Sequence, residues 1–395
     1  MSVNHAKLPS DNALISKVVR ALYAPWLDKS ARKFQELAKQ GEAEYRNLVT
    51  SVNAEPDTCI VFADGLRFDV AGMLQERLEQ RGLRVKLNHR IAPLPTVTAT
   101  AKPIASPAHS ACEGGASAED FNPVLSVSKQ SVSASRLRDE MARQGVEVLD
   151  QDETTLAAKA DKGGWTEIGR LDEMGHSLGV SLVRHIDVEV EAIADRVAAL
   201  LGTGWARVRV VTDHGWLLVP GGMPKVELPA HLVATKWARC ASVRGDSTTA
   251  VPTFAWYWNV HARIASPPGI GSFIINTEYA HGGVSLQECV VPELLVQRGE
   301  VAEKAKITEI TWRGMRCRVV VETNADGLRL ELRRNWKQPD PEGQRITAVK
   351  ELGSNGQASL AVERDEYEGT AAMAVILDGA GRVIDYQATT IGEEQ

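Results

Sequence analysis

The chain has 395 residues, of which 44% are hydrophobic and 24% are charged. This composition is that of an ordinary globular protein and excludes wholesale disorder or a fibrous repeat. Its 45 basic and 51 acidic side chains give a net charge of −6, which excludes the strongly basic coat of proteins that hold nucleic acid non-specifically. The length predicts a main domain and a smaller companion.

The amino-terminal residues 1–12 are polar where a signal peptide needs an apolar stretch, and no apolar run approaches the roughly 18–20 residues that span a bilayer. The cysteines are scattered and form no CxxC pair, which predicts reduced thiols in the core. They are Cys59, Cys112, Cys240, Cys289 and Cys317. We therefore expect a cytoplasmic protein that does not contact membranes.

Residues 12–50 carry apolar side chains at helical spacing, among them Val18, Leu22 and Phe34. Pro25 interrupts this pattern, which predicts two helices in an amphipathic hairpin. We interpret residues 1–54 as an N-terminal helical arm.

The next part of the chain alternates strand and helix patterns and begins with a βαβ unit. A long stretch at 93–133, rich in Pro, Ala, Ser and Thr, has little periodicity and is predicted to be a functional loop. The predicted strands are 58–63, 83–87, 146–149, 207–212, 253–260, 273–276 and 290–296, and the predicted helices are 66–81, 135–144 and 188–201. This order predicts an α/β domain over 55–300, with a mainly parallel sheet flanked by helices.

The last part of the chain changes character after a charged linker at 299–306. Short strand patterns alternate there with turn signals such as Asp-Gly and Ser-Asn-Gly, which predicts a small β-sandwich domain over 305–395. The predicted strands are 307–312, 317–322, 328–332, 358–362, 371–377 and 383–387.

A first candidate metal motif is Asp172-Glu-Met-Gly-His176. A carboxylate and an imidazole four residues apart lie one helical turn or one tight loop apart, so both can reach one ion. On its own, this spacing is more often a solvated helix face.

Further candidates follow predicted strands, at the end of the sheet where α/β folds hold their ligands. Asp213 and His214 come directly after strand 207–212, and Asp64 comes after strand 58–63. A polar turn would explain the first pair equally well, and Asp64 could be a helix N-cap. His281 precedes two glycines, which let the backbone approach a site closely, although a lone loop histidine is usually only hydrogen-bonded.

Taken together, these motifs supply six nitrogen and oxygen ligands, which is what two divalent ions need to stabilise both the attacking and the leaving oxygen of a displacement at phosphorus. Thr96, Thr98 and Thr100 lie in one turn and offer hydroxyl nucleophiles, which metal coordination would activate. Lys102 could balance phosphate charge. Without the ligand set, this turn would be an ordinary β-branched loop, and Lys102 an exposed lysine.

The order of these motifs resembles the alkaline phosphatase superfamily, including nucleotide pyrophosphatases and phosphodiesterases. It resembles more closely the PglZ proteins of the BREX bacteriophage-defence systems. The resemblance lies in five phrases between residues 60 and 297, at 62–69, 94–103, 171–176, 211–215 and 279–292.

The resemblance implies that Asp172, His176 and His281 hold one metal, and that a second set holds the other. That second set is Asp64, Asp213 and His214. Thr98, in preference to Thr96, would be the nucleophile that bridges toward both ions. Zinc is the usual ion of the superfamily, with manganese or magnesium as alternatives.

Two functional hypotheses follow. The first is a metal-dependent phosphodiesterase or nuclease of a BREX phage-defence system, acting on nucleic acid or nucleotides through Thr98. The second is a non-autonomous scaffold whose phosphatase-like domain mediates assembly with other BREX proteins or engages DNA. The ligand set favours the first, because clustered carboxylates repel one another unless cations neutralise them.

Overall fold

The computed structural model describes residues 9–115, 119–150, 161–245, 247–299, 305–323, 325, 327–334, 344–353, 355–379 and 381–393. The chain forms two compact units, Met1–Arg298 and Gly299–Gln395. The further division of the first unit into a helical arm and a catalytic domain stays a prediction.

The first unit is built on a six-stranded sheet of order β2-β14-β7-β1-β6-β5. β1 pairs in parallel with β6 and β7, and β5 pairs in parallel with β6, whereas β14 is antiparallel to both β7 and β2. The strands are β1 (Thr58–Phe62), β2 (Leu83–Ile91), β5 (Glu147–Val148), β6 (Gly164–Glu167), β7 (Arg207–Val211) and β14 (Val290–Arg298). The predicted α/β fold class with a mainly parallel sheet is thus confirmed.

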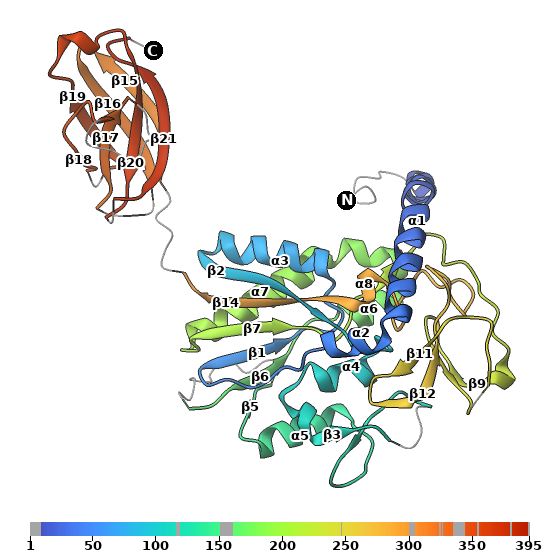
Figure 1. The fold of residues 1–395 in the computed structure, drawn as a ribbon. Coiled ribbons are helices and arrows are strands. Elements are labelled where there is room, and N and C mark those ends of the chain that lie inside the picture. The colour runs from blue at the N-terminus through green and yellow to red at the C-terminus, as the bar shows by residue number, and fades with distance from the viewer. Residues whose placement is uncertain are drawn as a thin grey trace. The chain divides into compact units, whose positions relative to one another are not determined.

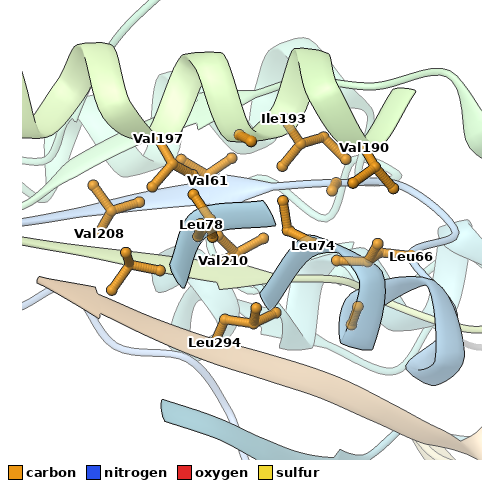
Figure 2. Close-up of a cluster of buried hydrophobic side chains, with 14 of the residues drawn as sticks. Val61, Leu66, Leu74, Leu78, Val190, Ile193, Val197, Val208, Val210 and Leu294 are labelled. Carbon is orange, nitrogen blue, oxygen red and sulfur yellow. The ribbon is translucent and has the colours of Figure 1, made fainter. Parts of the chain in front are cut away.

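Helices cover both faces of this sheet, which explains why β1 is buried along its whole length. Alternate side chains of a strand point to opposite faces, and Val61 accordingly packs with α3 (Phe68–Gln80) and α7 (Ile186–Gly202). Figure 2 shows this contact, with Leu74 of α3 and Ile193 of α7 around the strand. Ile60 points the other way, toward α5 (Ala134–Arg143), which lies on the opposite face in Figure 1.

The predicted helix break at Pro25 is wrong. A single helix, α1 (Pro9–Gln40), runs through this proline, and the chain turns only at Gly41, before α2 (Glu42–Leu48). Leu27 and Ala31 follow the proline, are fully buried and belong to one apolar cluster with Leu217 and Ala280 of the same unit. Their burial offsets the roughly 3 kcal/mol that a proline costs inside a helix.

Two further predictions need correction. The stretch 93–133 is not one loop, because it contains α4 (Thr98–Ile104), the 3₁₀ turn η2 (Pro107–Ala111) and a hairpin, although residues 116–118 lie outside the described part. The hairpin pairs β3 (Cys112–Glu113) with β4 (Val124–Leu125). Residues 273–276 form no strand, since Asn276 adopts a positive φ of 59° and ends a turn.

The remaining elements of the first unit lie around the carboxyl ends of the parallel strands (Figure 1). A second sheet has the order β11-β12-β10-β9, and a two-stranded ladder pairs β13 with β8. The elements are α6 (Leu171–Leu178), η3 (Gly179–Arg184), β8 (Leu217–Leu218), η4 (Ala230–Leu232), β9 (Val233–Lys236), β10 (Ala241–Val243), β11 (Thr253–Trp256), β12 (Asn259–Ala265), β13 (Tyr279–Ala280) and α8 (Leu286–Cys289).

The second unit consists of two antiparallel sheets, β15-β16-β19 and β18-β17-β20-β21. Both sheets contribute to one core, to which β15 gives Trp312, β17 gives Leu330 and β20 gives Ile376. The elements are β15 (Ala305–Arg313), β16 (Arg316–Thr323), β17 (Arg329–Arg333), β18 (Lys350–Glu351), β19 (Gln357–Ala361), η5 (Asp365–Tyr367), β20 (Ala371–Leu377) and β21 (Val383–Thr390). The shared core agrees with the predicted small sandwich.

In the described part of the chain, no helix combines the length and the apolar character that crossing a bilayer requires. All five cysteines are free and buried, as expected for core thiols.

Candidate metal centre

The parallel strands bring the predicted ligands to one edge of the sheet. β1 lies between β6 and β7 and runs in the same direction as both, so their carboxyl ends meet. Asp64 follows β1, the pair at 213–214 follows β7, and α6 follows β6 with two more ligands. His281 joins them from the loop after β13. The parallel pairing of β6, β1 and β7 therefore brings the cluster together, although its members are far apart in the sequence.

One group of possible ligands contains the three residues of the first predicted set. Asp172, His176 and His281 offer ligand atoms that all lie within 4.8 Å of one another. The Nε2 atoms of the two histidines are 3.1 Å apart, and a carboxylate oxygen of Asp172 lies 3.6 Å from His176 and another lies 3.4 Å from His281.

The second group differs from the predicted set. It joins Asp64 and His214 with Asp172, so Asp172 reaches both groups. Asp213 is turned partly toward the backbone, because its Oδ1 accepts hydrogen bonds from the N–H of His214 at 3.0 Å and from the Thr212 hydroxyl at 3.3 Å. Its other oxygen, Oδ2, remains 3.6 Å from Nε2 of His214.

Backbone carbonyls orient two of the imidazoles. Nδ1 of His214 lies 3.1 Å from the carbonyl oxygen of Gly215, and Nδ1 of His281 lies 3.0 Å from that of Thr96. A carbonyl oxygen only accepts hydrogen bonds, so each Nδ1 carries the proton, and Nε2 of the neutral ring turns its lone pair toward the cluster. Metal-binding histidines are usually held in this way.

Two carboxylate oxygens in the cluster lie 3.6 Å from Nε2 of His214 but have no hydrogen-bond partner in the described part of the chain. Oδ1 of Asp64 and Oδ2 of Asp213 are inaccessible to solvent and make no hydrogen bond within the described residues. Buried, unpaired carboxylate oxygens are costly, and a cation removes this cost. The residues therefore fit divalent metal ions, and a set of aspartate and histidine ligands suits zinc, manganese or magnesium.

The same crowding shifts the ionisation of the metal-free cluster. Burial and the neighbouring carboxylate of Asp213 raise the pKa of Asp64 well above its ordinary value. Burial, helped by the neighbouring imidazole of His214, lowers the pKa of His281 to about 4. Burial opposes charge on His214, but Asp213 and two other carboxylates raise its pKa. In the metal-free cluster, proton binding is therefore strengthened at Asp64 and His214 and weakened at His281.

The three threonines of the 96–100 turn have different surroundings. Oγ1 of Thr98, the first residue of α4, lies 3.1 Å from Nε2 of His214. The buried Thr96 hydroxyl donates to the backbone of the 281–283 loop at 2.9 Å and accepts from it at 3.1 Å. The Thr100 hydroxyl also bonds two buried partners. Of the three hydroxyls, only that of Thr98 faces the cluster.

Lys102 lies one helical turn after Thr98 but is not free. Its Nζ is 2.7 Å from a carboxylate oxygen of Glu167 and lies over the ring of Phe62, 4.5 Å from the centroid. The structure thus gives this lysine an internal counter-ion.

Two supporting interactions were not predicted. The hydroxyl of Tyr279 donates to Oδ1 of Asp172 at 2.8 Å. The fully buried pair Arg239–Glu288 holds the 281–283 loop, since Oε1 of Glu288 accepts from the backbone N–H of Gly283 at 2.8 Å. Glu288 stands three residues after the N-cap Ser285, a capping-box spacing that could have revealed it. No comparable pattern marks Tyr279.

No model of a known protein family matches this chain, and a comparison with curated proteins finds no match. The structure is similar in fold to solved structures of an ectonucleotide pyrophosphatase/phosphodiesterase and of a phosphonoacetate hydrolase. Murine ectonucleotide pyrophosphatase/phosphodiesterase 5 in complex with AMP is 13% identical, with a TM-score of 0.41, and the match covers 62% of this chain and 88% of that one. For the human protein, the identity is 12%, the TM-score is 0.39 and the coverage is the same, 62% and 88%.

Phosphonoacetate hydrolase from Sinorhizobium meliloti, in complex with phosphonoacetate, is 12% identical, with a TM-score of 0.34, and the match covers 62% of this chain and 94% of that one. At such identities, similarity concerns the fold and does not indicate which reaction a chain catalyses.

Proposed function

We propose that this chain is a metal-dependent phosphoric ester hydrolase that acts on phosphodiesters, with Thr98 as the nucleophile. One observation carries the proposal. The Thr98 hydroxyl lies 3.1 Å from His214, in a cluster where Asp64 and Asp213 each hold a buried carboxylate oxygen without a hydrogen-bond partner. Phosphoryl transfer at a metal site needs a nucleophile beside ligands that can bind cations, and Thr98 and the two carboxylates supply both.

In this proposal, two cations are held by the predicted ligands. These are Asp64, Asp172, His176, Asp213, His214 and His281. When bound, the cations would offset the charge of the phosphoryl oxygens and favour the deprotonated hydroxyl.

The chain's own residues perform the rest of the proposed reaction. The Thr98 hydroxyl loses its proton as its oxygen bonds to phosphorus, while the ester bond breaks and the leaving oxygen takes up a proton. Water then attacks phosphorus and breaks the phosphothreonine bond, which releases a phosphate monoester and restores the Thr98 hydroxyl. Tyr279 holds Asp172 in place through its hydroxyl. The occupied hydroxyls of Thr96 and Thr100 favour Thr98 over its neighbours as the nucleophile.

We propose further that the chain is a PglZ protein and acts in bacteriophage defence with other BREX proteins, on nucleic acid or nucleotides. The order of the sequence phrases supports this. Residues 55–300 would be the catalytic domain, with the arm at 1–54 and the β-sandwich at 305–395 as accessory parts.

The test measures hydrolysis of bis-p-nitrophenyl phosphate and of plasmid DNA by metal-stripped protein that is restored with zinc, manganese or magnesium. Thr98→Ala is expected to lower metal-restored turnover by about 10³-fold or more, whereas Thr98→Ser keeps a hydroxyl and part of the rate. Full turnover by Thr98→Ala would exclude this nucleophile. Folded, metal-loaded wild type without turnover would instead favour the scaffold hypothesis.

A further inference from the structure

A cavity of about 300 Å³ lies in the first unit, apart from the metal centre. α1 and α2 form one side, and β11 and β12 form the other; Figure 1 shows these elements next to one another. Neither Thr98 nor any of the six predicted metal ligands lines it. The lining residues are Ala38, Glu42, Ala43, Tyr45, Arg46, Leu94, Phe254, Ala255, Tyr257, Val260 and Arg263.

Most polar groups of this lining are already paired within the protein. Arg263 binds both carboxylate oxygens of Glu42, at 3.2 and 3.0 Å, and Lys39 adds a third contact to that carboxylate at 3.0 Å. The hydroxyl of Tyr45 donates to the carbonyl of Ala92 at 2.8 Å. The acidic side chain and the tyrosine therefore have their partners without a ligand.

Arg46 is an exception. Its Nη1 is inaccessible to solvent and has no hydrogen-bond acceptor within the described residues. Its guanidinium lies over the ring of Tyr257, 5.0 Å from the centroid, which holds the group but satisfies none of its N–H donors. Because Nη1 is inaccessible, an anion in the cavity would pair with the other N–H groups of Arg46, which lines the cavity and forms no ion pair within the described residues. Carboxylates and phosphates are the best partners of a planar guanidinium.

The rest of the lining is apolar or aromatic. Leu94 and the ring of Phe254 are buried, while Val260 is 48% exposed, so the cavity opens to solvent beside it. Clefts of this size that combine apolar walls with a few polar groups are typical of small-molecule sites. A cavity that combines the charge of Arg46 with the rings of Phe254 and Tyr257 suits a small molecule that has an anionic group and a flat, apolar body.

We propose that this cavity binds a small organic anion, whose carboxylate or phosphate group pairs with Arg46 and whose apolar body packs between Leu94, Phe254 and Tyr257. The proposal does not depend on the catalytic function. The cavity shares no residue with the metal centre. A failure of either proposal therefore leaves the other intact.

The test is isothermal titration calorimetry of the full chain with phenylacetate and, separately, with phenyl phosphate. Wild type is expected to bind at least one of the two with one site per chain. Arg46→Met keeps the apolar stem but removes the charge-assisted hydrogen bonds, and is expected to weaken binding by about 10- to 100-fold. The tighter of the two probes identifies the head group.

Two further variants make the result specific. Val260→Trp fills the exposed mouth without touching the charge, and it should also weaken binding. Arg84→Met removes an exposed arginine on β2 and should leave binding unchanged. Circular dichroism establishes that each variant is folded. The proposal is overturned if neither probe binds wild type saturably, or if Arg46→Met binds as tightly as wild type.

Discussion

Replacing Gly175 by alanine is expected to destabilise the first unit, although alanine favours helices more than glycine does. Gly175 lies in the middle of α6. An added Cβ would lie only 2.6 Å from Cδ2 of Tyr279 and nearer still to two other atoms of that ring. The ring must move, and its hydroxyl would then lose the 2.8 Å hydrogen bond to Asp172.

The size of the effect follows from three contributions. Overpacking costs about 1–3 kcal/mol, the lost hydrogen bond to a charged carboxylate costs about 1.5–3 kcal/mol, and helix propensity returns about 1 kcal/mol. The free energy of unfolding should therefore fall by about 1.5–5 kcal/mol. At about 2.1 cal/mol/K of unfolding entropy per residue over Met1–Arg298, this lowers the Tm by about 2–8 °C.

Differential scanning calorimetry checks this value, with Gly72→Ala as the matched control. Gly72 also lies inside a helix, α3, but nothing stands within 4 Å of its added Cβ. The control should gain about 1 kcal/mol from helix propensity, which raises the Tm by about 1–2 °C. If Gly175→Ala melted at or above the wild-type temperature, the packing of Tyr279 against α6 would not restrain Asp172 as described.

Two other substitutions test the surroundings of the site. Arg239→Met should lower the free energy of unfolding by about 3–5 kcal/mol, because it leaves the fully buried Glu288 without its counter-ion; an unchanged midpoint in urea denaturation would contradict this. Burial opposes charge on Glu167, but Lys102 lowers the pKa of this carboxyl below its usual 4.5. Its stabilising contribution is therefore present above that pH and is lost as the pH falls through the lowered pKa. Glu167→Gln should accordingly flatten the fall in unfolding free energy on acidification, and equal slopes for the two proteins would refute the assignment.

Much of the central sheet could be predicted from local patterns. The strand patterns at 58–63 and 207–212 are rich in β-branched and apolar residues, and each is followed directly by an aspartate. Both the strand and the polar residue after it can therefore be identified in the sequence. β1 and β7 lie there. The order of strand and helix then implied parallel pairing, since a helical connection returns the chain in the same direction.

Local patterns failed where distant packing decides the outcome. Pro25 predicts a helix break by its own chemistry, but α1 continues because residues after it are buried against β8 and β13. Residues 273–276 look like a strand, yet only Phe273 is buried and the segment belongs to no sheet of the described residues, with one backbone hydrogen bond from Phe273 to Ala238. In both places, the environment of the segment outweighs its intrinsic preference.

The sequence by itself determined the chemical inventory of the candidate site, because the identity of a carboxylate or an imidazole does not depend on the fold. Only the tertiary structure decided how that inventory is arranged. It places Asp172 within reach of both ligand groups, turns Thr98 and not Thr96 toward His214, and pairs Lys102 internally. The partners in these contacts, such as Thr98 and His214, are separated by tens of positions along the chain. Their distances therefore depend on sheet order and packing, which short-range patterns do not contain.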